Sequence, residues 1–326
     1  LGGGIGPNAP WAGLTADHLR EVTMVTADGD IVTANQRRNA DLFWGLRGGA
    51  GGNFGVVTNL VYDLVEVPVT RATTFTLDFP AEAAIAAGLA WQQVRRGNEE
   101  RLGSSWTVSN SRNGVSARVR AQVLLPEADA RALMAPLTSI PGAVADVAER
   151  TWWDTYAWYR TPISPSNTFR DRSLFAEADL SAAVIEQAVK IVQRFPSAAD
   201  SGGSFGLSGW IGGRVNSVAP DATAYVHRGA RSLIEIRAGW PNPVDPSRWP
   251  TPVPAPIDSW LQELWDVALP ASTGQCYQNF PDPGLTDPGQ VYYGTNLRRL
   301  RQVKAKWDPD NVFRYRQSIR PAGEHG

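Results

Sequence analysis

Two glycine-rich segments constrain this chain more than any other feature of its sequence. The first is Leu1-Gly2-Gly3-Gly4-Ile5-Gly6, and the second is RGGAGGNFGVV, which runs from Arg47 to Val57. Glycine has no Cβ, so such a backbone can approach a flat ring or a pyrophosphate closely and donate its N–H groups to it. Taken singly, each segment is also compatible with a structural turn. Neither fits a P-loop, because no Gly-Lys-Ser/Thr follows, and neither has the strand–turn–helix setting of a dinucleotide fingerprint.

The residues around these segments predict one α/β block over 1–68. Two short strands between Glu21 and Ala34 flank Asp28-Gly29, a favoured hairpin turn. A short helix is expected from Asn39, with Gly48 as its stop signal. The apolar run 56–67 then predicts another strand.

The middle of the chain has a different pattern, which predicts an antiparallel sheet covered on one face by helices. Strict alternation over 115–124 indicates a strand with one buried face. Further strands are expected at 73–79, 106–111, 205–211 and 233–238, and helices at 82–96, 181–195, 257–268 and 295–307. The aromatic stretch 152–159 is expected to be irregular. The pattern predicts an α+β fold of two domains, one formed by 1–68 with 270–326 and the other by 69–269.

The composition excludes several classes of function. The 326-residue chain has a net charge of −1 and dispersed basic residues, which do not predict nucleic-acid binding. One cysteine, Cys276, leaves no pair for an internal disulfide, and three histidines far apart in sequence do not predict a zinc site. No apolar stretch of about 18 residues predicts a membrane span. Because the chain opens on Leu1 directly before glycines, we expect it to begin inside a longer protein, and its localisation stays open.

The order of motifs resembles the berberine bridge enzyme-like FAD-linked oxidases of the vanillyl-alcohol oxidase (PCMH-type) flavoprotein superfamily. GGGIG, GLTADHL, VTADGDIVTA and DLFWGLRGGAGGNFGVV are similar to the later part of that family's FAD domain. IGGRVNSVAPDATAYVHR resembles its substrate-domain core, and CYQNFPDPGL with VYYGTNLRRLRQVKAKWDPDNVFRYRQSI resembles its closing segment. The resemblance implies a PCMH-type FAD-binding domain that lacks its N-terminal part, plus a substrate domain with a large antiparallel sheet covered by helices.

The resemblance also implies which residues contact FAD, and the substrate would lie between the flavin ring and the middle sheet. The ring and ribityl chain would lie against Gly2, Gly3, Gly4 and Gly6. The adenosine and pyrophosphate would contact Asp17, Gly52, Gly55 and Val57, and Asn53 would be a further cofactor contact. The isoalloxazine would lie near the polar groups of Asn279 and Asn296.

Two departures from the family pattern concern the chemistry of the site. The histidine and cysteine that attach the flavin covalently in this family lie upstream of the GGG segment, so covalent attachment and oxygen reactivity stay open. The motif Tyr-x-Asn-Tyr, whose second tyrosine is the family's usual base, is here Tyr277-Gln278-Asn279-Phe280, and phenylalanine cannot accept a proton. Tyr277 and Tyr293 are the candidate catalytic residues in its place, and Tyr292, the middle domain or the upstream segment remain alternative sources of the base.

The function implied is an FAD-dependent oxidase that passes a hydride from an alcohol, sugar or natural-product intermediate to flavin N5, with O2 as electron acceptor. A flavin- or ligand-binding protein without turnover and a dehydrogenase with another acceptor remain alternatives. The expected partners are a small-molecule substrate and O2. His227, which follows a strand-like Ala224-Tyr225-Val226, is either structural or a residue of the sheet near the site.

Overall fold

The computed structural model describes residues 1–160, 167–196, 201–242 and 251–323. The chain folds as two compact units. Unit 1 contains Leu1–Glu66, Gly212–Ala230 and Gln275–Gly326, and unit 2 contains Val67–Ile211 and Arg231–Gly274. The segment Gly212–Ala230 therefore belongs with the chain ends, whereas the sequence boundaries place it in the middle domain. Its short loops carry no periodicity that distinguishes them from their neighbours, so only the tertiary structure assigns them.

Unit 1 is built on a three-stranded antiparallel sheet with the strand order β2-β1-β3. Val25 of β1 lies opposite Ile31 of β2, so the turn between them contains Asp28-Gly29, and the predicted hairpin is confirmed. Gly29 has a φ of 84°, the left-handed conformation that this turn requires. The strands of this sheet are β1 (Leu19–Val25), β2 (Ile31–Asn35) and β3 (Val56–Tyr62).

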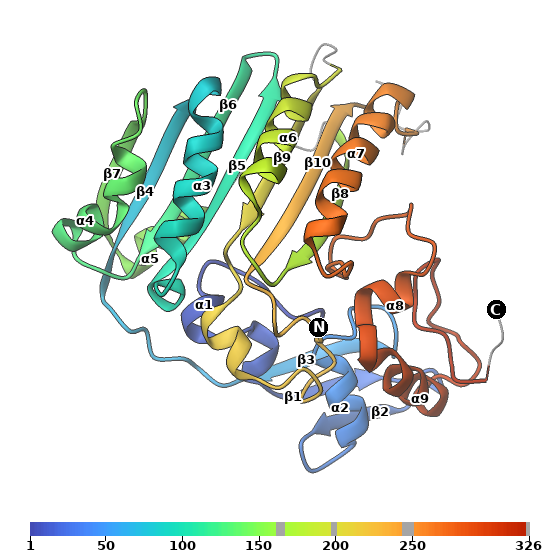
Figure 1. The fold of residues 1–326 in the computed structure, drawn as a ribbon. Coiled ribbons are helices and arrows are strands. Elements are labelled where there is room, and N and C mark those ends of the chain that lie inside the picture. The colour runs from blue at the N-terminus through green and yellow to red at the C-terminus, as the bar shows by residue number, and fades with distance from the viewer. Residues whose placement is uncertain (161–166, 197–200, 243–250, 324–326) are drawn as a thin grey trace. The chain divides into compact units, whose positions relative to one another are not determined.

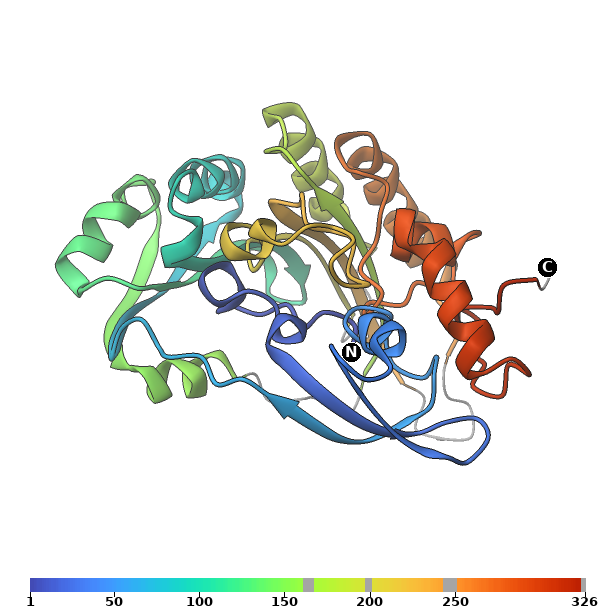
Figure 2. The same ribbon diagram turned by 90° about the horizontal axis from the view of Figure 1, so that it is seen from below.

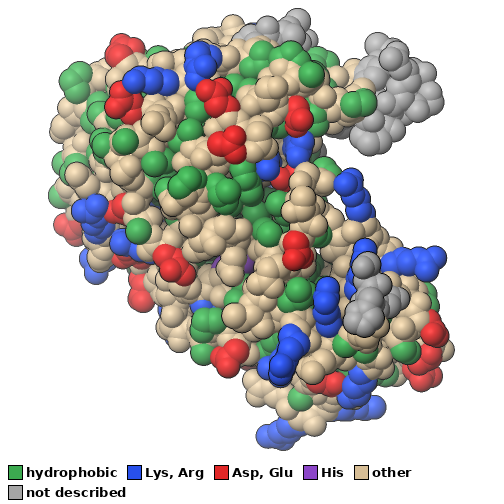
Figure 3. Space-filling model, turned by 45° about the vertical axis from the view of Figure 1, so that its right-hand side comes forward, with side chains coloured by type: hydrophobic (Ala, Val, Ile, Leu, Met, Phe, Trp, Pro, Cys, Tyr) green, Lys and Arg blue, Asp and Glu red, His purple; other side chains and the backbone are tan. Residues whose placement is uncertain are grey.

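The helices of unit 1 include the predicted C-terminal helix. The unit contains α1 (Ala9–Ala12), α2 (Ala40–Leu46), α8 (Pro288–Tyr293) and α9 (Leu297–Trp307). Arg298, Arg299 and Arg301 are exposed on α9, as a solvated helix face requires, but Lys304 is fully buried. Its Nζ donates to Asp308 at 2.5 Å and to two backbone carbonyls at 2.7 Å. On the face of the molecule in Figure 3, basic and acidic side chains are interspersed.

Unit 2 is built on a seven-stranded antiparallel sheet with the order β7-β4-β6-β5-β9-β10-β8. Its strands are β4 (Arg71–Pro80), β5 (Leu102–Ser111), β6 (Gly114–Val123), β7 (Val144–Thr151), β8 (Asn167–Ala176), β9 (Gly202–Ser208) and β10 (Ser232–Pro241). The helices α3 (Ala84–Arg95), α6 (Ala182–Gln193) and α7 (Ala255–Ala268) cover one face of the sheet (Figures 1 and 2). The predicted α+β class with a large helix-covered sheet is therefore confirmed.

Several elements of unit 2 were not predicted. These are α4 (Glu127–Thr138), β7, α5 (Trp152–Tyr159) and β8. The aromatic stretch expected to be irregular is the helix α5, whose start is capped because the Thr151 hydroxyl accepts from the Asp154 N–H. Within the proline-rich run 240–256, residues 243–250 lie outside the described residues. Among the helices of the described ranges, none is long and apolar enough to cross a membrane.

The helix α5 lies on the sheet face opposite α3, α6 and α7. The Tyr159 hydroxyl donates to the Gly103 carbonyl at 2.9 Å, and Arg120 donates to the Trp158 carbonyl at 2.7 Å. The Arg120 guanidinium also lies 4.3 Å from the centroid of the Trp158 ring. These contacts place α5 over β6 and the start of β5, and among the described residues no helix of unit 2 covers β9 and β10 on this side.

Candidate active site

Other side chains of the protein pack directly against part of the first glycine segment. A Cβ at Gly2 would lie 1.9 Å from Oδ1 of Asn279, and one at Gly3 would lie 2.8 Å from the Tyr225 ring. A Cβ at Gly4 would lie 2.6 Å from Cβ of Thr15. Glycine at 2–4 therefore lets neighbouring side chains lie directly against this backbone, a reason for these glycines that sequence reasoning did not include. The expected cofactor contacts of Gly2 and Gly3 stay a prediction.

Beyond these residues the same loop opens into a cavity of about 340 Å³. Gly4, Gly6 and Gly13 contribute backbone to its wall, and a Cβ at Gly6 would meet nothing within 4 Å. His18 and Asp63 also border this cavity. A wall of glycine backbone lets a flat or anionic group reach main-chain N–H groups, so this part of the loop fits the cofactor predicted from the sequence.

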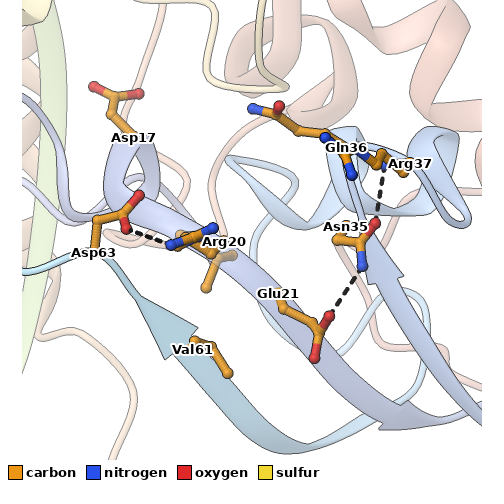
Figure 4. A pocket seen from close by; sticks show the side chains of 9 residues that line it. Asp17, Arg20, Glu21, Asn35, Gln36, Arg37, Val61 and Asp63 are labelled. Atoms are coloured by element: carbon orange, nitrogen blue, oxygen red, sulfur yellow. Dashed lines mark hydrogen bonds and ion pairs between the residues drawn. The ribbon is translucent and has the colours of Figure 1, made fainter.

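A second cavity, of about 730 Å³, lies in the same unit and shares Asp63 with the first. Figure 4 shows its polar lining, in which Arg20 pairs with Asp63 at 3.1 Å. Asn35 lies opposite Glu21 across β1 and β2, and its Nδ2 donates to the Glu21 carboxylate at 2.9 Å.

A buried ion pair fixes the turn that follows the first glycine segment. Both carboxylate oxygens of Asp17 accept from Arg228, at 2.9 and 2.6 Å, and one also accepts from the Leu14 N–H at 2.9 Å. The Arg228 side chain is 1% exposed. Asp17 also borders the larger cavity. Its side chain therefore joins the turn to the segment 212–230, in addition to the backbone contact that the resemblance implies.

His227 lies in that same segment, in backbone that is not a strand. Of the two alternatives for His227, a place on the sheet is wrong, because the whole segment 212–230 is part of unit 1. Its Nδ1 lies 2.9 Å from Oε1 of Gln275, and its ring packs edge-on against Tyr225 at 5.2 Å between centroids. Burial lowers the pKa of His227 to about 4, so the ring is neutral at physiological pH.

The two tyrosines predicted from the resemblance occupy different settings. The Tyr277 hydroxyl accepts from Nδ2 of Asn279 at 2.6 Å and from the Ile5 N–H at 3.5 Å, which places it against the first glycine segment. Burial raises its pKa above 10. Tyr293 is 1% exposed, and its hydroxyl donates to the carbonyl of Gly49, a residue of the second glycine segment, at 3.3 Å. Both roles in catalysis remain predictions, and Tyr277 has the more accessible surroundings.

Asn296 and Asn53 support the backbone around the glycine segments. Asn296 is buried and its Nδ2 donates to the carbonyls of Pro220 and Thr223, at 2.8 and 3.2 Å. Asn53 is also buried, and its Oδ1 accepts from the Ile319 N–H at 2.9 Å. Each of these two amides therefore forms hydrogen bonds with protein groups, and their contacts with FAD stay predictions.

The remaining predicted contacts lie on or near β3. Gly52 is exposed with a φ of 74°, and Val57 pairs with Met24 in the sheet. A Cβ at Gly55 would lie 2.3 Å from the Val25 carbonyl oxygen, so glycine is needed there for the close approach of β1 and β3.

In unit 2, the sheet face opposite α3, α6 and α7 carries small hydroxyl side chains. We call this surface the hydroxyl face and define it by Ser105, Thr107 and Ser109 of β5, Ser204, Gly206 and Ser208 of β9, and Glu235 of β10. The alternate residues of these strands, such as Trp106, Phe205 and Ile236, are buried under the helices. The Ser208 hydroxyl and the Trp210 indole N–H are buried and have no hydrogen-bond partner in the described part of the chain. Unsatisfied buried donors are rare in proteins, so each of these two groups has room for a partner that the described residues do not supply.

Glu235 is the residue of this face that sequence reasoning missed. It lies opposite Gly206, which lies opposite Thr107, so the three form one row across β10, β9 and β5. Among the described residues, no hydrogen bond or ion pair holds its carboxylate. Burial, followed by the charge of Asp171, raises its pKa to about 7. The sequence signal was a lone carboxylate in the apolar run Leu233-Ile234-Glu235-Ile236. No group of His, Cys, Asp and Glu in the described ranges could hold a metal ion.

Comparison with known proteins agrees with the motifs. The family described as Berberine and berberine like matches residues 276–320. An uncharacterized FAD-linked oxidoreductase of Bacillus subtilis is 30% identical over 331 residues, which cover 98% of this chain and 69% of that protein. A chitooligosaccharide oxidase of Gibberella zeae is also 30% identical, over 98% of this chain and 66% of its own length.

Solved structures share the fold. A chitooligosaccharide oxidase structure superposes with a TM-score of 0.82 at 26% identity, covering 98% of this chain and 70% of that one. The berberine bridge enzyme of Eschscholzia californica superposes with a TM-score of 0.83 over 100% of this chain and 70% of its own, at 22% identity, which shows the fold alone.

Proposed function

Since the chain belongs to the berberine bridge enzyme-like family of FAD-linked oxidoreductases, we propose that it oxidises a hydroxyl group of a saccharide-like substrate and passes the electrons to O2. The observation that carries this proposal is the hydroxyl face, where serine and threonine hydroxyls surround one unpartnered carboxyl group. Small hydroxyl side chains can both donate to and accept from the hydroxyl groups of a sugar. Relatives named as chitooligosaccharide, xylooligosaccharide and carbohydrate oxidases support the same substrate class.

The two units would have separate roles in this reaction. Unit 1 would hold FAD, with the backbone at Gly4, Gly6 and Gly13 against the cofactor, and unit 2 would bind the substrate on the hydroxyl face. Bound FAD supplies a two-electron acceptor for the hydride that leaves the substrate carbon. Solved relatives include a glucooligosaccharide oxidase with covalently bound flavin.

We assign to Glu235 the proton that the reaction releases. Oxidation of an alcohol to a carbonyl removes a hydride from carbon and a proton from oxygen. A carboxylate with a pKa of about 7 is ionised in part at neutral pH and is basic enough to take that proton. Tyr277 is the second candidate, because its hydroxyl lies against the first glycine segment.

The test uses the full-length flavoprotein and a panel of chito-, cello- and xylooligosaccharides with non-sugar alcohols as controls. We expect peroxide formation with at least one oligosaccharide. Glu235→Gln should lower kcat by about 10²–10⁴-fold, the usual contribution of a general base, while flavin content stays unchanged. Tyr277→Phe should lower it far less.

Turnover of the non-sugar alcohols alone would refute the substrate class. If sugars reduce the flavin without peroxide formation and an artificial dye restores turnover, the protein is a dehydrogenase. Full activity of Glu235→Gln together with loss of activity in Tyr277→Phe would move the base to Tyr277.

A further inference from the structure

Two acidic side chains and one basic side chain lie beside one another at one edge of the hydroxyl face. Arg237 follows Glu235 by two residues on β10, so both side chains point to the same face of the sheet. Asp171 of β8 lies directly opposite Arg237, which makes it the diagonal neighbour of Glu235. Diagonal neighbours in an antiparallel pair have Cα atoms about 7–8 Å apart, within reach of strong charge–charge interaction.

Arg237 is engaged by β8 and not by Glu235. Its Nε lies 3.4 Å from Oδ1 of Asp171, and its guanidinium lies 4.2 Å from the centroid of the Phe169 ring. Glu235 has no ion pair among the described residues. Asp171 is therefore paired with the cation Arg237, whereas Glu235 is unpaired among the described residues and is influenced by the charges of both.

We propose that Asp171 is a positioning residue for the reaction, which acts through Glu235 by making that carboxyl group a stronger proton acceptor, while Arg237 limits the effect. The proposal rests on the assignment of proton transfer to Glu235 in the proposed function. It adds that the basicity of Glu235 is raised further, beyond the effect of burial, by a residue that need not touch the substrate.

The directions of the two influences follow from elementary electrostatics. A second negative charge disfavours ionisation of Glu235, so Asp171 raises its pKa, in addition to the larger effect of burial. The positive charge of Arg237 lowers it. A carboxylate held near a pKa of 7 can accept a proton at neutral pH, whereas an ordinary glutamate is about 300 times weaker as a base.

No other charge faces Glu235 from the strands beside it. On β9 the same face presents only Ser204, Gly206 and Ser208. On β8, Arg170 and Arg172 point the opposite way, because Arg170 pairs with Asp258 and Arg172 packs on Trp265, both of α7. Asp171 is therefore the negative charge and Arg237 the positive charge that control this carboxyl group.

The test compares four variants of the full-length flavoprotein: Asp171→Asn, Arg237→Gln, Glu235→Gln and Asp78→Asn. Asp78 is the matched control, since it lies on the same face of the sheet but four strands from Glu235. The row that joins the two contains Gly206, Thr107 and Arg118. At about 4.8 Å between strands, the separation is roughly 19 Å, beyond the range of unscreened interaction.

The first readout needs no substrate. In protein labelled with ¹³C at the glutamate side-chain carboxyl, the NMR signal that disappears in Glu235→Gln is titrated against pH. We expect its midpoint to fall by about one pH unit in Asp171→Asn, to rise in Arg237→Gln, and to stay the same in Asp78→Asn. The acid limb of the kcat profile, measured with cellobiose or N,N′-diacetylchitobiose, whichever turns over faster, should move in the same directions.

An unchanged midpoint in Asp171→Asn, or shifts of the same sign in both charge variants, would overturn the inference. If Glu235→Gln keeps full activity while the NMR shifts appear, the coupling is present and the proposed function of Glu235 is the part that fails. If Glu235→Gln is inactive and neither charge variant moves the midpoint, the proposed function stands and only the role of Asp171 fails.

Discussion

At the scale of single residues, neighbouring glycines of one motif turn out to serve different purposes. Gly3 has a φ of 118° and its missing Cβ makes room for the Tyr225 ring, whereas Gly6 has an ordinary backbone conformation and borders an open cavity. A substitution is therefore expected to disturb packing at Gly3, whereas at Gly6 it would test the proposed contact with the cofactor. This difference allows the cofactor role of the loop to be tested separately from its structural role.

We expect Gly6→Ala to lower flavin content or flavin affinity without lowering the stability of the protein, because the added methyl group meets no protein atom but occupies the cavity. Gly3→Ala should prevent folding or lower stability severely. Gly51→Ala, where a Cβ also meets nothing within 4 Å but which does not border the cavity, is the control. Flavin absorbance per protein and the thermal midpoint give the comparison, and equal flavin content in Gly6→Ala and Gly51→Ala would contradict the role of Gly6.

His227 predicts a pH dependence of stability. Its pKa is lowered from 6.5 to about 4 by burial, so the unfolded chain binds a proton that the folded chain does not between these values. Stability should therefore fall as the pH drops from about 6.5 to about 4, by about 3 kcal/mol in total. The difference in unfolding free energy between the wild type and His227→Gln should narrow over this range. A constant difference would show that His227 does not titrate in the folded protein as expected.

At the scale of elements, the segment 212–230 of unit 1 has little regular secondary structure and is held by buried polar contacts. Arg228 binds Asp17 through both carboxylate oxygens and donates to the Val215 carbonyl and the Thr223 hydroxyl. Asn296 holds the carbonyls of the same segment from the start of α9. Polar contacts replace the ladder of hydrogen bonds that a strand or helix would supply.

Arg228→Met should lower the free energy of unfolding by about 3–5 kcal/mol, because it leaves Asp17 as a nearly buried charge without its partner. Arg214→Met, at an exposed position of the same segment, should change it by less than about 0.5 kcal/mol. Urea unfolding of the purified flavoprotein measures both. Equal stability of the two variants would mean that the ion pair gains no more than its desolvation costs.

At the scale of the whole molecule, each unit has a hydrophobic core of its own. The core of unit 2 lies between its seven-stranded sheet and the covering helices and includes Leu207, which is 1% exposed. The core of unit 1 includes Phe43 and Phe54. Two cores allow the units to lose structure at different denaturant concentrations.

Leu207→Ala should destabilise unit 2 by about 2–5 kcal/mol through the cavity it leaves. We expect the unfolding transition followed by far-ultraviolet circular dichroism to acquire an early phase. The rise in flavin fluorescence should keep its midpoint, because we propose that unit 1 holds the cofactor. Leu269→Ala, at a position 39% exposed, is the control. A common shift of both signals would show that the units unfold as one.

The sequence by itself determined the family, the cofactor and the element types with strong periodicity. The hairpin at Asp28-Gly29, the strictly alternating strand β6 and the amphipathic helix α6 follow from local chemistry, since turn residues and the spacing of apolar side chains act over a few residues. The order of the glycine motifs likewise identified the FAD-linked oxidoreductases without any coordinates.

Only the tertiary structure decided which residues share a surface. The segment 212–230 belongs to unit 1, Lys304 is buried within a basic helix, and Glu235 lies beside Asp171 across sixty-four residues of sequence, because strand pairing and burial depend on partners far away in the chain. The pKa of a carboxyl group is set by these neighbours and by its distance from water, neither of which a linear pattern contains. The glycine loop was visible in the sequence, but the acid group we assign to the chemistry was not.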